Sequence, residues 1–370
     1  MREPDLTLGR VVVCVPARNE SEALPRLIRS LDRQHGIGDG ARLRVVVLAN
    51  NCTDDTVATL HGMERNAEIP NLTMRIIEAT IASPDAHVGT ARRRALDAGA
   101  AWLDQEGVAE GVLISTDADA VAPADWVMAN LRALRNAELV GGRLVLHGER
   151  PADDPRLAAL HARIEDYWVA VRRLEEVFDP PTHDPAPRHG DHVAASLALR
   201  ADLYRRVGGL PMLPCGEDNA LVARVRWHGG RVRHCPGVSI AVSDRGTGRV
   251  TGGMATEMLR RTRVAQGLET YCLPPAAHWR ALIERRRKLA RCFTDPAGTA
   301  AALSAIGIAD ADLAAIDWQT CPNGIALVER VEAQVGEGIP EAVPVPLDEA
   351  LAGLRAMLVE AQPAPAARVA

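Results

Sequence analysis

Residues 111–119 read Gly-Val-Leu-Ile-Ser-Thr-Asp-Ala-Asp, an apolar run that ends in two carboxylates separated by one residue. The uninterrupted aliphatic residues at its start are typical of a strand that is buried on both faces of a parallel sheet. Asp117 and Asp119 follow the end of that strand. Ligands of open α/β sheets bind beyond the carboxyl ends of the strands. The stretch therefore predicts such a sheet and a ligand site at its edge.

The segments around this stretch alternate between strand and helix patterns. Buried strands are predicted at 11–15, 43–48 and 74–77, and helices at 20–33, from about 53, and at 90–103. This alternation predicts a doubly wound, mostly parallel sheet with helices on its faces. Polar residues follow the strands here too, above all in the segment 50–55, where Thr53 or Asp54 can cap the next helix.

The pattern changes after Gly141 and Gly142. Helices are predicted at 157–177 and 217–227, the second ended by a Gly-Gly pair, and further strand residues at 232–242. From residue 254 onward the chain reads as mostly helical. We expect one large domain over 1–250, with a first half at 10–142 and a second at 143–250. A helical C-terminal extension over 251–370 would cover this domain or mediate a homo-oligomer contact.

The composition excludes several classes of protein. The 370 residues are 47% hydrophobic and 25% charged, with a net charge of −5, which gives no reason to expect a nucleic-acid partner. The N-terminus is polar, and no apolar run approaches the ~18 residues of a transmembrane segment. Seven dispersed cysteines without a CxxC pair fit reduced thiols better than a disulfide framework or a zinc site. A cytoplasmic protein is expected.

Asp117 and Asp119 are candidate metal ligands. Two carboxylates two residues apart on a turn can both reach one hard divalent cation, Mg²⁺ or Mn²⁺. Such a cation can neutralise a diphosphate leaving group. The alternative is a polar loop whose aspartates only cap structure, and the spacing alone does not decide between the two.

Six segments resemble the motifs of family 2 glycosyltransferases, in the same order along the chain. They are VCVPARNE at 13–20, LANNCTDDT at 48–56, GTAR at 89–92, TDAD at 116–119, SLALRADLYRRVGGL at 196–210 and GED at 216–218. The resemblance covers about residues 10–245. It implies a GT-A-type doubly wound mixed sheet, mostly parallel and Rossmann-like, that binds a nucleoside diphosphate-sugar in the half 10–142 and an acceptor in the half 143–250.

The resemblance also implies a role for individual residues. The donor would be bound by Pro16, Ala17, Glu20, Asn50, Arg92, Asp117 and Ala118. Apart from the resemblance, Arg245 lies in a Gly- and Arg-rich stretch that reads as a cationic loop, which could close over the diphosphate or be a plain mobile loop. Asp119 and Asp117 would hold the metal, with Asp244 as a candidate third ligand. Asp218, with Glu217 beside it, would be the general base that deprotonates the acceptor hydroxyl, with inversion at the anomeric carbon. Asp218 could instead cap the helix that begins there.

Three departures from the family pattern leave questions open. Ala49-Asn50 stands where acidic residues usually read uracil, and because Asn can pair with several bases the nucleotide is undecided. No His stands at 240–244, where many relatives have a metal ligand. His183, His189 and His192 lie in one loop without helical spacing or a Cys pair, so we expect an acceptor-side or solvated loop rather than zinc.

Other functions remain open on the sequence. A retaining transferase acting on an anionic acceptor, such as a glycerate or phosphoglycerate, would use the basic run Arg92-Arg93-Arg94 and the Arg245 loop. A protein that binds a sugar nucleotide without catalysis is also possible. A nucleotidyltransferase would carry a glycine-rich GxGxR segment near the N-terminus, and the sequence has none.

Overall fold

The computed structural model describes residues 8–36, 42–108, 110–147, 154–243, 254–294 and 296–361. The chain divides into two compact units. Unit 1 comprises Met1–Arg150, Pro187–Arg226 and Gly230–Ala255, and unit 2 comprises Pro151–Ala186, Trp227–Gly229 and Thr256–Ala370. Residues 151–186, expected in the second half of the large domain, therefore cluster with the C-terminal helices. The domain boundary at residue 250 stays a prediction.

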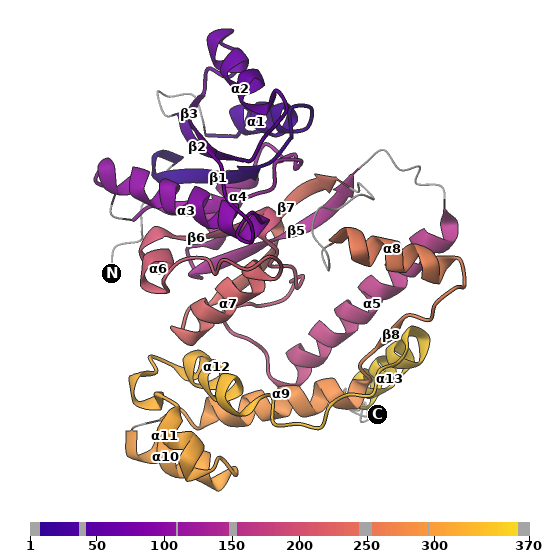
Figure 1. Cartoon of the computed structure of the whole chain (residues 1–370). Coiled ribbons are helices and arrows are strands. Elements are labelled where there is room, and N and C mark those ends of the chain that lie inside the picture. Colours follow the sequence, from indigo (N-terminus) through magenta and orange to yellow (C-terminus); the bar gives the residue numbers. More distant parts are fainter. Residues whose placement is uncertain are drawn as a thin grey trace, which may run out of the picture. The chain divides into compact units, whose positions relative to one another are not determined.

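Unit 1 is built on a seven-stranded sheet with the strand order β3-β2-β1-β4-β6-β5-β7 (Figure 1). The strands are β1 (Val11–Ala17), β2 (Leu43–Asn50), β3 (Leu72–Ala79), β4 (Val112–Ser115), β5 (Leu139–His147), β6 (Leu197–Arg200) and β7 (Val232–Ser243). β3, β2, β1 and β4 run parallel to one another, as do β5 and β7, whereas β6 is antiparallel to β4 and β5. The α/β class and the mostly parallel mixed sheet predicted from the sequence are confirmed.

Helices cover both faces of this sheet. α1 (Leu24–Asp32), α2 (Thr56–Arg65) and α4 (Trp126–Ala133) pack on one face, and α3 (Val88–Gln105), α6 (Ala201–Arg206) and α7 (Glu217–Trp227) on the other. Every residue of β1 is buried, with Val13 packing toward the first face and Cys14 toward the second. This two-sided burial is why the strand reads as a continuous apolar run.

β5 is an element that the sequence pattern did not predict. Gly141 and Gly142 lie inside it, and glycine weakens the signal of a strand. A Cβ atom at Gly141 would lie 2.2 Å from the main-chain oxygen of Asp191, and one at Gly142 would lie 2.1 Å from Ser196 Oγ. The Leu144 N–H also donates to the Asp191 carboxylate at 3.2 Å. The two glycines therefore let the segment 191–196 lie directly on the strand.

Unit 2 is mostly helical. Its elements are α5 (Pro155–Phe178), α9 (Ala276–Arg291), α10 (Pro296–Ala305), α11 (Asp310–Ala315), α12 (Gly324–Val335), α13 (Leu347–Glu360), most of α8 (Met254–Ala265), and the antiparallel pair β8 (Cys272–Leu273) and β9 (Val345–Pro346). One apolar cluster joins α5, α9 and α13, and a second joins the end of α9 to α10, α11 and α12. The predicted helical C-terminal region is confirmed.

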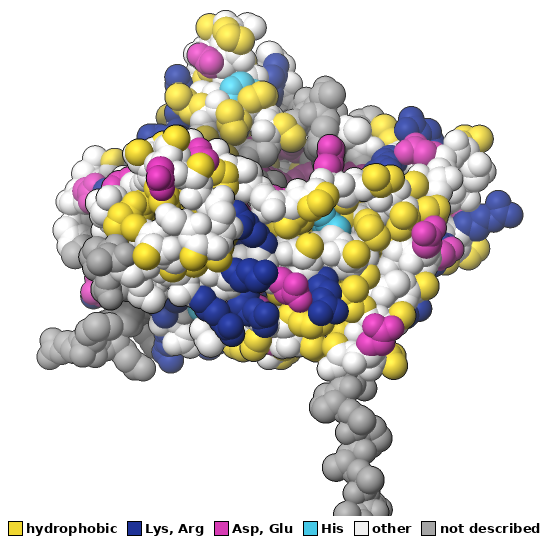
Figure 2. All heavy atoms as spheres, turned by 90° about the horizontal axis from the view of Figure 1, so that it is seen from below, with side chains coloured by type: hydrophobic (Ala, Val, Ile, Leu, Met, Phe, Trp, Pro, Cys, Tyr) yellow, Lys and Arg dark blue, Asp and Glu magenta, His cyan; other side chains and the backbone are white. Residues whose placement is uncertain are grey.

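Basic side chains are frequent in unit 2, and Figure 2 shows Lys and Arg side chains gathered on the surface seen from below. α9 alone carries Arg280, Arg285, Arg286, Arg287, Lys288 and Arg291. Arg286 pairs with Glu332 at 2.8 and 3.0 Å, and Arg287 donates to the main-chain oxygen of Phe178 at 3.0 Å. These two guanidinium groups therefore join helices within unit 2.

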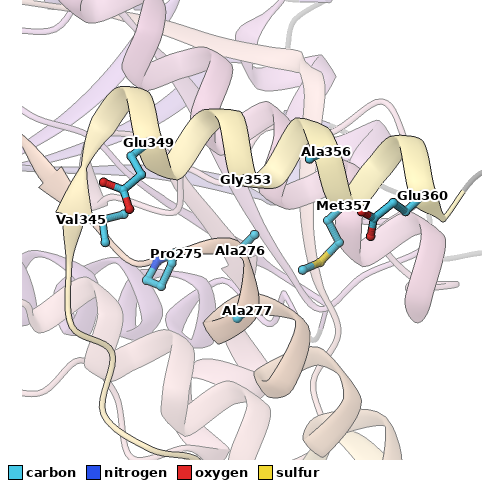
Figure 3. A pocket seen from close by; sticks show the side chains of 9 residues that line it. All are labelled: Pro275, Ala276, Ala277, Val345, Glu349, Gly353, Ala356, Met357 and Glu360. Atoms are coloured by element: carbon cyan, nitrogen blue, oxygen red, sulfur yellow. The ribbon is translucent and has the colours of Figure 1, made fainter.

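A pocket of about 380 Å³ lies between the start of α9 and α13 (Figure 3). It is lined by Pro275, Ala276, Ala277, Val345, Glu349, Gly353, Ala356, Met357 and Glu360. None of these residues belongs to a motif named above. Among the described residues, no helix combines the length and the apolar character needed to cross a membrane.

Candidate active site

The carboxyl ends of β1, β2 and β4 lie at one edge of the sheet in unit 1. The three strands are parallel neighbours, and the register places Ala17 beside Ala49 and Cys14 beside Ser115. The loops that follow these ends contain the residues 18–20, 51–55 and 116–119. Three of the segments that carry the motif resemblance are thus brought to the same edge of the sheet.

The loops after β1 and β2 are tied together by hydrogen bonds. Asn19 and Asn51 both adopt the left-handed backbone conformation, with φ of 53° and 52°, which Asn tolerates better than most residues. The Asn19 side chain accepts the N–H of Thr53 at 2.8 Å and donates to its hydroxyl at 3.1 Å. The Glu20 N–H donates to Thr56 Oγ1 at 2.8 Å. These bonds fix the two loops as one polar surface.

Asp54 stabilises the start of α2. Its carboxylate accepts the N–H of Ser21 and the N–H of Thr56, each at 3.1 Å, and also the Thr56 hydroxyl. Burial would raise the pKa of Asp54, but the hydrogen bonds from Thr56 and Ser21 lower it to about 2. The residue directly before the helix is Asp55 and not Thr53 or Asp54, the two that the sequence predicted, although the Asp54 carboxylate accepts the first N–H of the helix.

The residues expected around a nucleotide base lie at the ends of β1 and β2. Pro16 and Ala17 are buried in β1. Asn50 ends β2, is 3% exposed, and its Oδ1 has no hydrogen-bond partner within the described part of the chain. Its neighbour Asn51 differs, because it exchanges two hydrogen bonds with the main chain of Ile81, at 3.0 and 2.9 Å. A buried carbonyl oxygen without a partner is a candidate acceptor for a ligand.

Arg92, on the first turns of α3, connects four segments of unit 1. Its guanidinium donates to Asp117 Oδ1 at 2.7 Å, Glu217 Oε1 at 3.2 Å, Ser115 Oγ at 2.8 Å and the main-chain oxygen of Ala194 at 3.4 Å. The side chains of Arg92 and Glu217 are 4% and 7% exposed, and that of Asp117 is 38% exposed. The structure therefore places Arg92 between the Asp-x-Asp turn and the start of α7.

The positive charge of Arg92 is stabilised by its two carboxylate partners, Asp117 and Glu217. Burial opposes the charged form, but Asp117 and Glu217 raise the pKa of Arg92 above its usual value. Glu217, a candidate catalytic residue, is itself buried in this ion pair. A diphosphate contact for Arg92 remains a prediction, since the guanidinium donors described here already bind protein oxygens.

The Asp-x-Asp segment forms a turn. The Ala120 N–H donates to the main-chain oxygen of Asp117 at 3.2 Å, and Val121 pairs with Ala241 of β7 through hydrogen bonds of 2.8 and 3.1 Å. Ala118 is buried beneath the turn, whereas Asp119 is half-buried. The candidate ligand Asp244 and the loop residue Arg245 lie outside the described residues.

The described residues of this turn include two candidate ligands of a divalent cation, Asp117 and Asp119. No group of three or more His, Cys, Asp or Glu side chains could hold a metal ion within the ranges that the structure describes. Mg²⁺ is commonly bound by one or two protein carboxylates together with phosphate oxygens of the substrate. Asp117 and Asp119 provide that donor set, so the residues fit a cation shared with a diphosphate.

Asp218, the candidate general base, lies in the first turn of α7, which begins at Glu217 as predicted. Its Oδ2 accepts the N–H of Ala194 at 3.1 Å, and its Oδ1 accepts the N–H of Asn219 at 2.8 Å. Each carboxylate oxygen can accept more than one hydrogen bond. The half-buried carboxylate is therefore oriented by the main chain and retains lone pairs for a substrate proton.

The three histidines of the Pro- and His-rich loop are divided between the two units. His183 belongs to unit 2, whereas His189 and His192 belong to unit 1. His192 lies beside His234 of β7, with 3.1 Å between the ring nitrogens Nδ1 and Nε2. The sequence did not indicate His234, because a single His in an alternating strand gives no signal of a contact 42 residues away.

Trp126 has no free face for a sugar. It is 1% exposed, and its Nε1 donates to Ser196 Oγ at 2.9 Å. This residue is therefore part of the core of unit 1. Ser196 is thereby fixed between Trp126 and the close approach to Gly142.

No protein-family model and no curated protein matches the chain. Among solved structures, it is similar to Staphylococcus aureus TarS, residues 1–349, in complex with UDP, with 15% identity, coverage of 95% of this chain and 88% of that one, and a TM-score of 0.43. It is also similar to a mannosyltransferase from Pyrobaculum calidifontis in complex with GDP-Man and Mn²⁺, with 18% identity, 89% and 88% coverage, and a TM-score of 0.44.

A third similar structure is the glucosyl-3-phosphoglycerate synthase of Mycobacterium tuberculosis, with 15% identity, coverage of 73% of this chain and 90% of that one, and a TM-score of 0.38. With identities of at most 18% and TM-scores below 0.5, these likenesses assign neither an activity nor a ligand to this chain.

Proposed function

We propose that unit 1 is a GT-A-type glycosyltransferase that moves a sugar from a nucleoside diphosphate-sugar to an acceptor hydroxyl. The observation that carries the proposal is the Arg92 ion-pair cluster. Arg92 of the GTAR segment contacts Asp117 of the TDAD segment and Glu217 of the GED segment. Motif segments that are far apart in the sequence thus meet at the sheet edge where α/β folds bind ligands.

The donor nucleotide would bind over the ends of β1 and β2. The interlocked loops of Asn19 and Thr53 present polar groups there, and Pro16, Ala17 and Glu20 lie on or next to β1. The unpaired Oδ1 of Asn50 supports a contact to an N–H group of the base, because a buried acceptor without a partner costs about 1–3 kcal/mol until it is satisfied. Uracil, guanine and adenine all offer such a donor, so the base stays open.

Asp119 and Asp117 would hold a divalent cation together with the donor diphosphate. When bound, such a cation stabilises the negative charge of the leaving diphosphate. Asp117 already neutralises part of the Arg92 charge, so we assign Asp119 as the main protein ligand. The contributions of Asp244 and Arg245 remain predictions.

Asp218 would act as the general base in an inverting transfer. Its carboxylate takes the proton of the acceptor hydroxyl, the acceptor oxygen forms a bond to the anomeric carbon, and the bond from that carbon to the diphosphate oxygen breaks with its electron pair leaving on the diphosphate. An alcohol is a poor nucleophile, and proton transfer to a positioned carboxylate contributes about 10²–10⁴ in rate. The hydrogen bonds from Ala194 and Asn219 hold Asp218 in place for this role.

The experiment for this assignment compares wild type with Asp218→Asn. The purified chain is incubated with UDP-, GDP- and ADP-sugars and Mn²⁺, and release of the nucleoside diphosphate is measured with candidate acceptors and with water as the acceptor. We expect Asp218→Asn to lose at least about 100-fold in turnover while it still binds the nucleotide. Unchanged turnover, or a product that retains the anomeric configuration by NMR, would remove Asp218 from the role of base.

The alternative of a retaining transferase with an anionic acceptor is based in part on the basic run Arg92-Arg93-Arg94, and the contacts of this run give it less support. Of the basic run 92–94, Arg92 is buried in its ion pairs, and Arg93 binds Asp97 at 2.7 Å and the main-chain oxygens of Gly208 and Leu210 at 2.9 and 3.0 Å. Only Arg94 of the three is exposed. The run therefore serves the packing of α3 more than the binding of an anion, and we propose no second function.

A further inference from the structure

His192, His234 and Asn219 form a hydrogen-bonded chain next to Asp218. His192 Nε2 lies 2.9 Å from Asn219 Oδ1, and His192 Nδ1 lies 3.1 Å from His234 Nε2. His234 is 8% exposed, and the rings of His192 and His234 have centroids 5.3 Å apart. The chain therefore links three elements: the segment before β6, the start of α7 and the start of β7.

The orientation of the Asn219 amide sets the protonation pattern of this chain, because its Oδ1 faces His192 Nε2. An amide oxygen only accepts, so in this arrangement Nε2 of His192 carries the proton and donates. In the neutral ring, Nδ1 of His192 then accepts from Nε2–H of His234. Burial, the neighbouring His234 and Arg226 of α7 lower the pKa of His192 to about 4, which agrees with a neutral ring.

The segment that carries His192 is held firmly against the sheet on its other side. The main chain at 191–192 approaches Gly141 so closely that a Cβ atom there would lie 2.8 Å from His192 Cα. Asp191 accepts the N–H of Leu144 in β5, and a His189 ring nitrogen lies 3.2 Å from the main-chain oxygen of Cys235 in β7. The segment 189–192 is thus fixed by its contacts with β5 and β7, and the start of α7 packs against it.

We propose that His192 is a positioning residue for Asp218. Its neutral imidazole binds Asn219, the residue after Asp218, while the Asp218 carboxylate binds the N–H of Ala194, two residues after His192. The two hydrogen bonds clamp the first turn of α7 onto the segment 191–194 and set the orientation of the Asp218 carboxylate. The effect on catalysis in this inference rests on the proposed function, whereas the effect of the two hydrogen bonds on the orientation of Asp218 does not.

Two substitutions of His192 separate positioning from general folding effects. His192→Leu removes both ring nitrogens at similar volume, whereas His192→Gln can place an amide N–H near the position of Nε2 and keep the bond to Asn219. His61→Leu is the matched control, since His61 lies on α2 with a side chain that is 48% exposed. All three variants are compared with wild type after far-UV circular dichroism has established that they are folded.

The first readout is independent of activity. The N–H groups of Ala194 and Asn219 donate to the Asp218 carboxylate, and we expect their hydrogen exchange, measured by NMR, to be about tenfold faster in His192→Leu. His192→Gln should restore protection, and His61→Leu should match wild type. Equal protection of these two amides in wild type and His192→Leu would overturn the proposal, even if the chain binds no nucleotide.

The second readout is kinetic. With the nucleotide-sugar that the chain turns over, His192→Leu should lower kcat about tenfold to a hundredfold, because small misplacements of a catalytic group are costly. The KM for the donor and the calorimetric affinity for the nucleoside diphosphate should stay within about twofold, and His192→Gln should recover most of kcat. A parallel loss of donor affinity, or no recovery in His192→Gln, would contradict positioning. Absence of nucleotide binding in wild type would instead contradict the proposed function.

Discussion

At the scale of single residues, the candidate site depends on Arg92 and on which groups it touches. The GTAR resemblance predicted that Arg92 would lie near the site, but it did not predict its partners. Asp117 and Glu217 are 25 and 125 residues away in the sequence, and such contacts are decided by how the strands are ordered in the sheet. The same reasoning explains why nothing in the sequence indicated His234, whereas the place of Asn50 at the end of β2 could be predicted from the apolar run before it.

Loss of the Arg92 charge is expected to destabilise unit 1. Arg92→Met leaves the carboxylate of Glu217 buried without its partner, and removing one member of a buried ion pair costs about 3–5 kcal/mol. The free energy of unfolding from urea denaturation measures this cost. Arg29→Met is the control, because the Arg29–Glu68 pair is exposed and such pairs contribute about 0–1 kcal/mol. Equal losses in the two variants would contradict the account.

Acid should weaken the folded state through His192. The native structure keeps this ring neutral down to a pKa of about 4, facing His234 of β7 and Arg226 and Asp218 of α7, whereas in the unfolded chain it protonates near 6.5. The unfolded state therefore binds more protons between these values, and the free energy of unfolding falls as the pH is lowered from about 6.5 to about 4. Urea denaturation of wild type and His192→Gln at pH 7 and pH 5 measures the contribution of His192 to the pH dependence of the free energy of unfolding. We expect a smaller pH dependence in His192→Gln, and identical dependence would refute it.

At the scale of elements, the strands and helices before residue 115 could be predicted because each has a strong apolar period and a polar stop. β5 could not, because its glycines are required for a contact with the segment 191–196 that the sequence does not show. α7 was predicted with its observed bounds, since Gly229 and Gly230 end it and Glu217 and Asp218 suit its first turn. The segment 191–196 also contacts the first turn of α7, through His192 with Asn219 and Ala194 with Asp218.

A methyl group on β5 should disturb this arrangement. In Gly141→Ala the new Cβ would lie 2.2 Å from the main chain of Asp191, so the segment 191–194 has to move. We expect a loss of about 1–3 kcal/mol in the free energy of unfolding and a loss of turnover, because Ala194 orients Asp218. Gly62→Ala on α2 meets no atom within 4 Å and should raise stability by about 0.5–1 kcal/mol. A Gly141→Ala variant with the free energy of unfolding and the turnover of wild type would contradict the close approach of the segment 191–194 to β5.

At the scale of the whole molecule, the α/β sheet and the helical C-terminal region could be predicted from the sequence, whereas the grouping of residues 151–186 with the C-terminal helices could not. Residues 151–186 read as one amphipathic helix and a loop, and nothing in that pattern indicates that α5 packs with α9 and α13. The candidate site is assembled within unit 1, from the ends of β1, β2 and β4 and the start of α7. The function that we propose for it requires a nucleotide whose diphosphate shares a cation with Asp119.

Calorimetric titration of UDP, GDP and ADP, each with and without Mn²⁺, tests that requirement most directly. We expect one nucleotide to bind at least about tenfold more tightly with Mn²⁺, a difference of about 1.4 kcal/mol. Asp119→Ala should abolish the gain, and Asp125→Ala should keep it, since the Asp125 carboxylate is exposed and pairs with Arg132. Tight binding that needs no metal and survives Asp119→Ala, or no binding of any of the three nucleotides, would contradict the account.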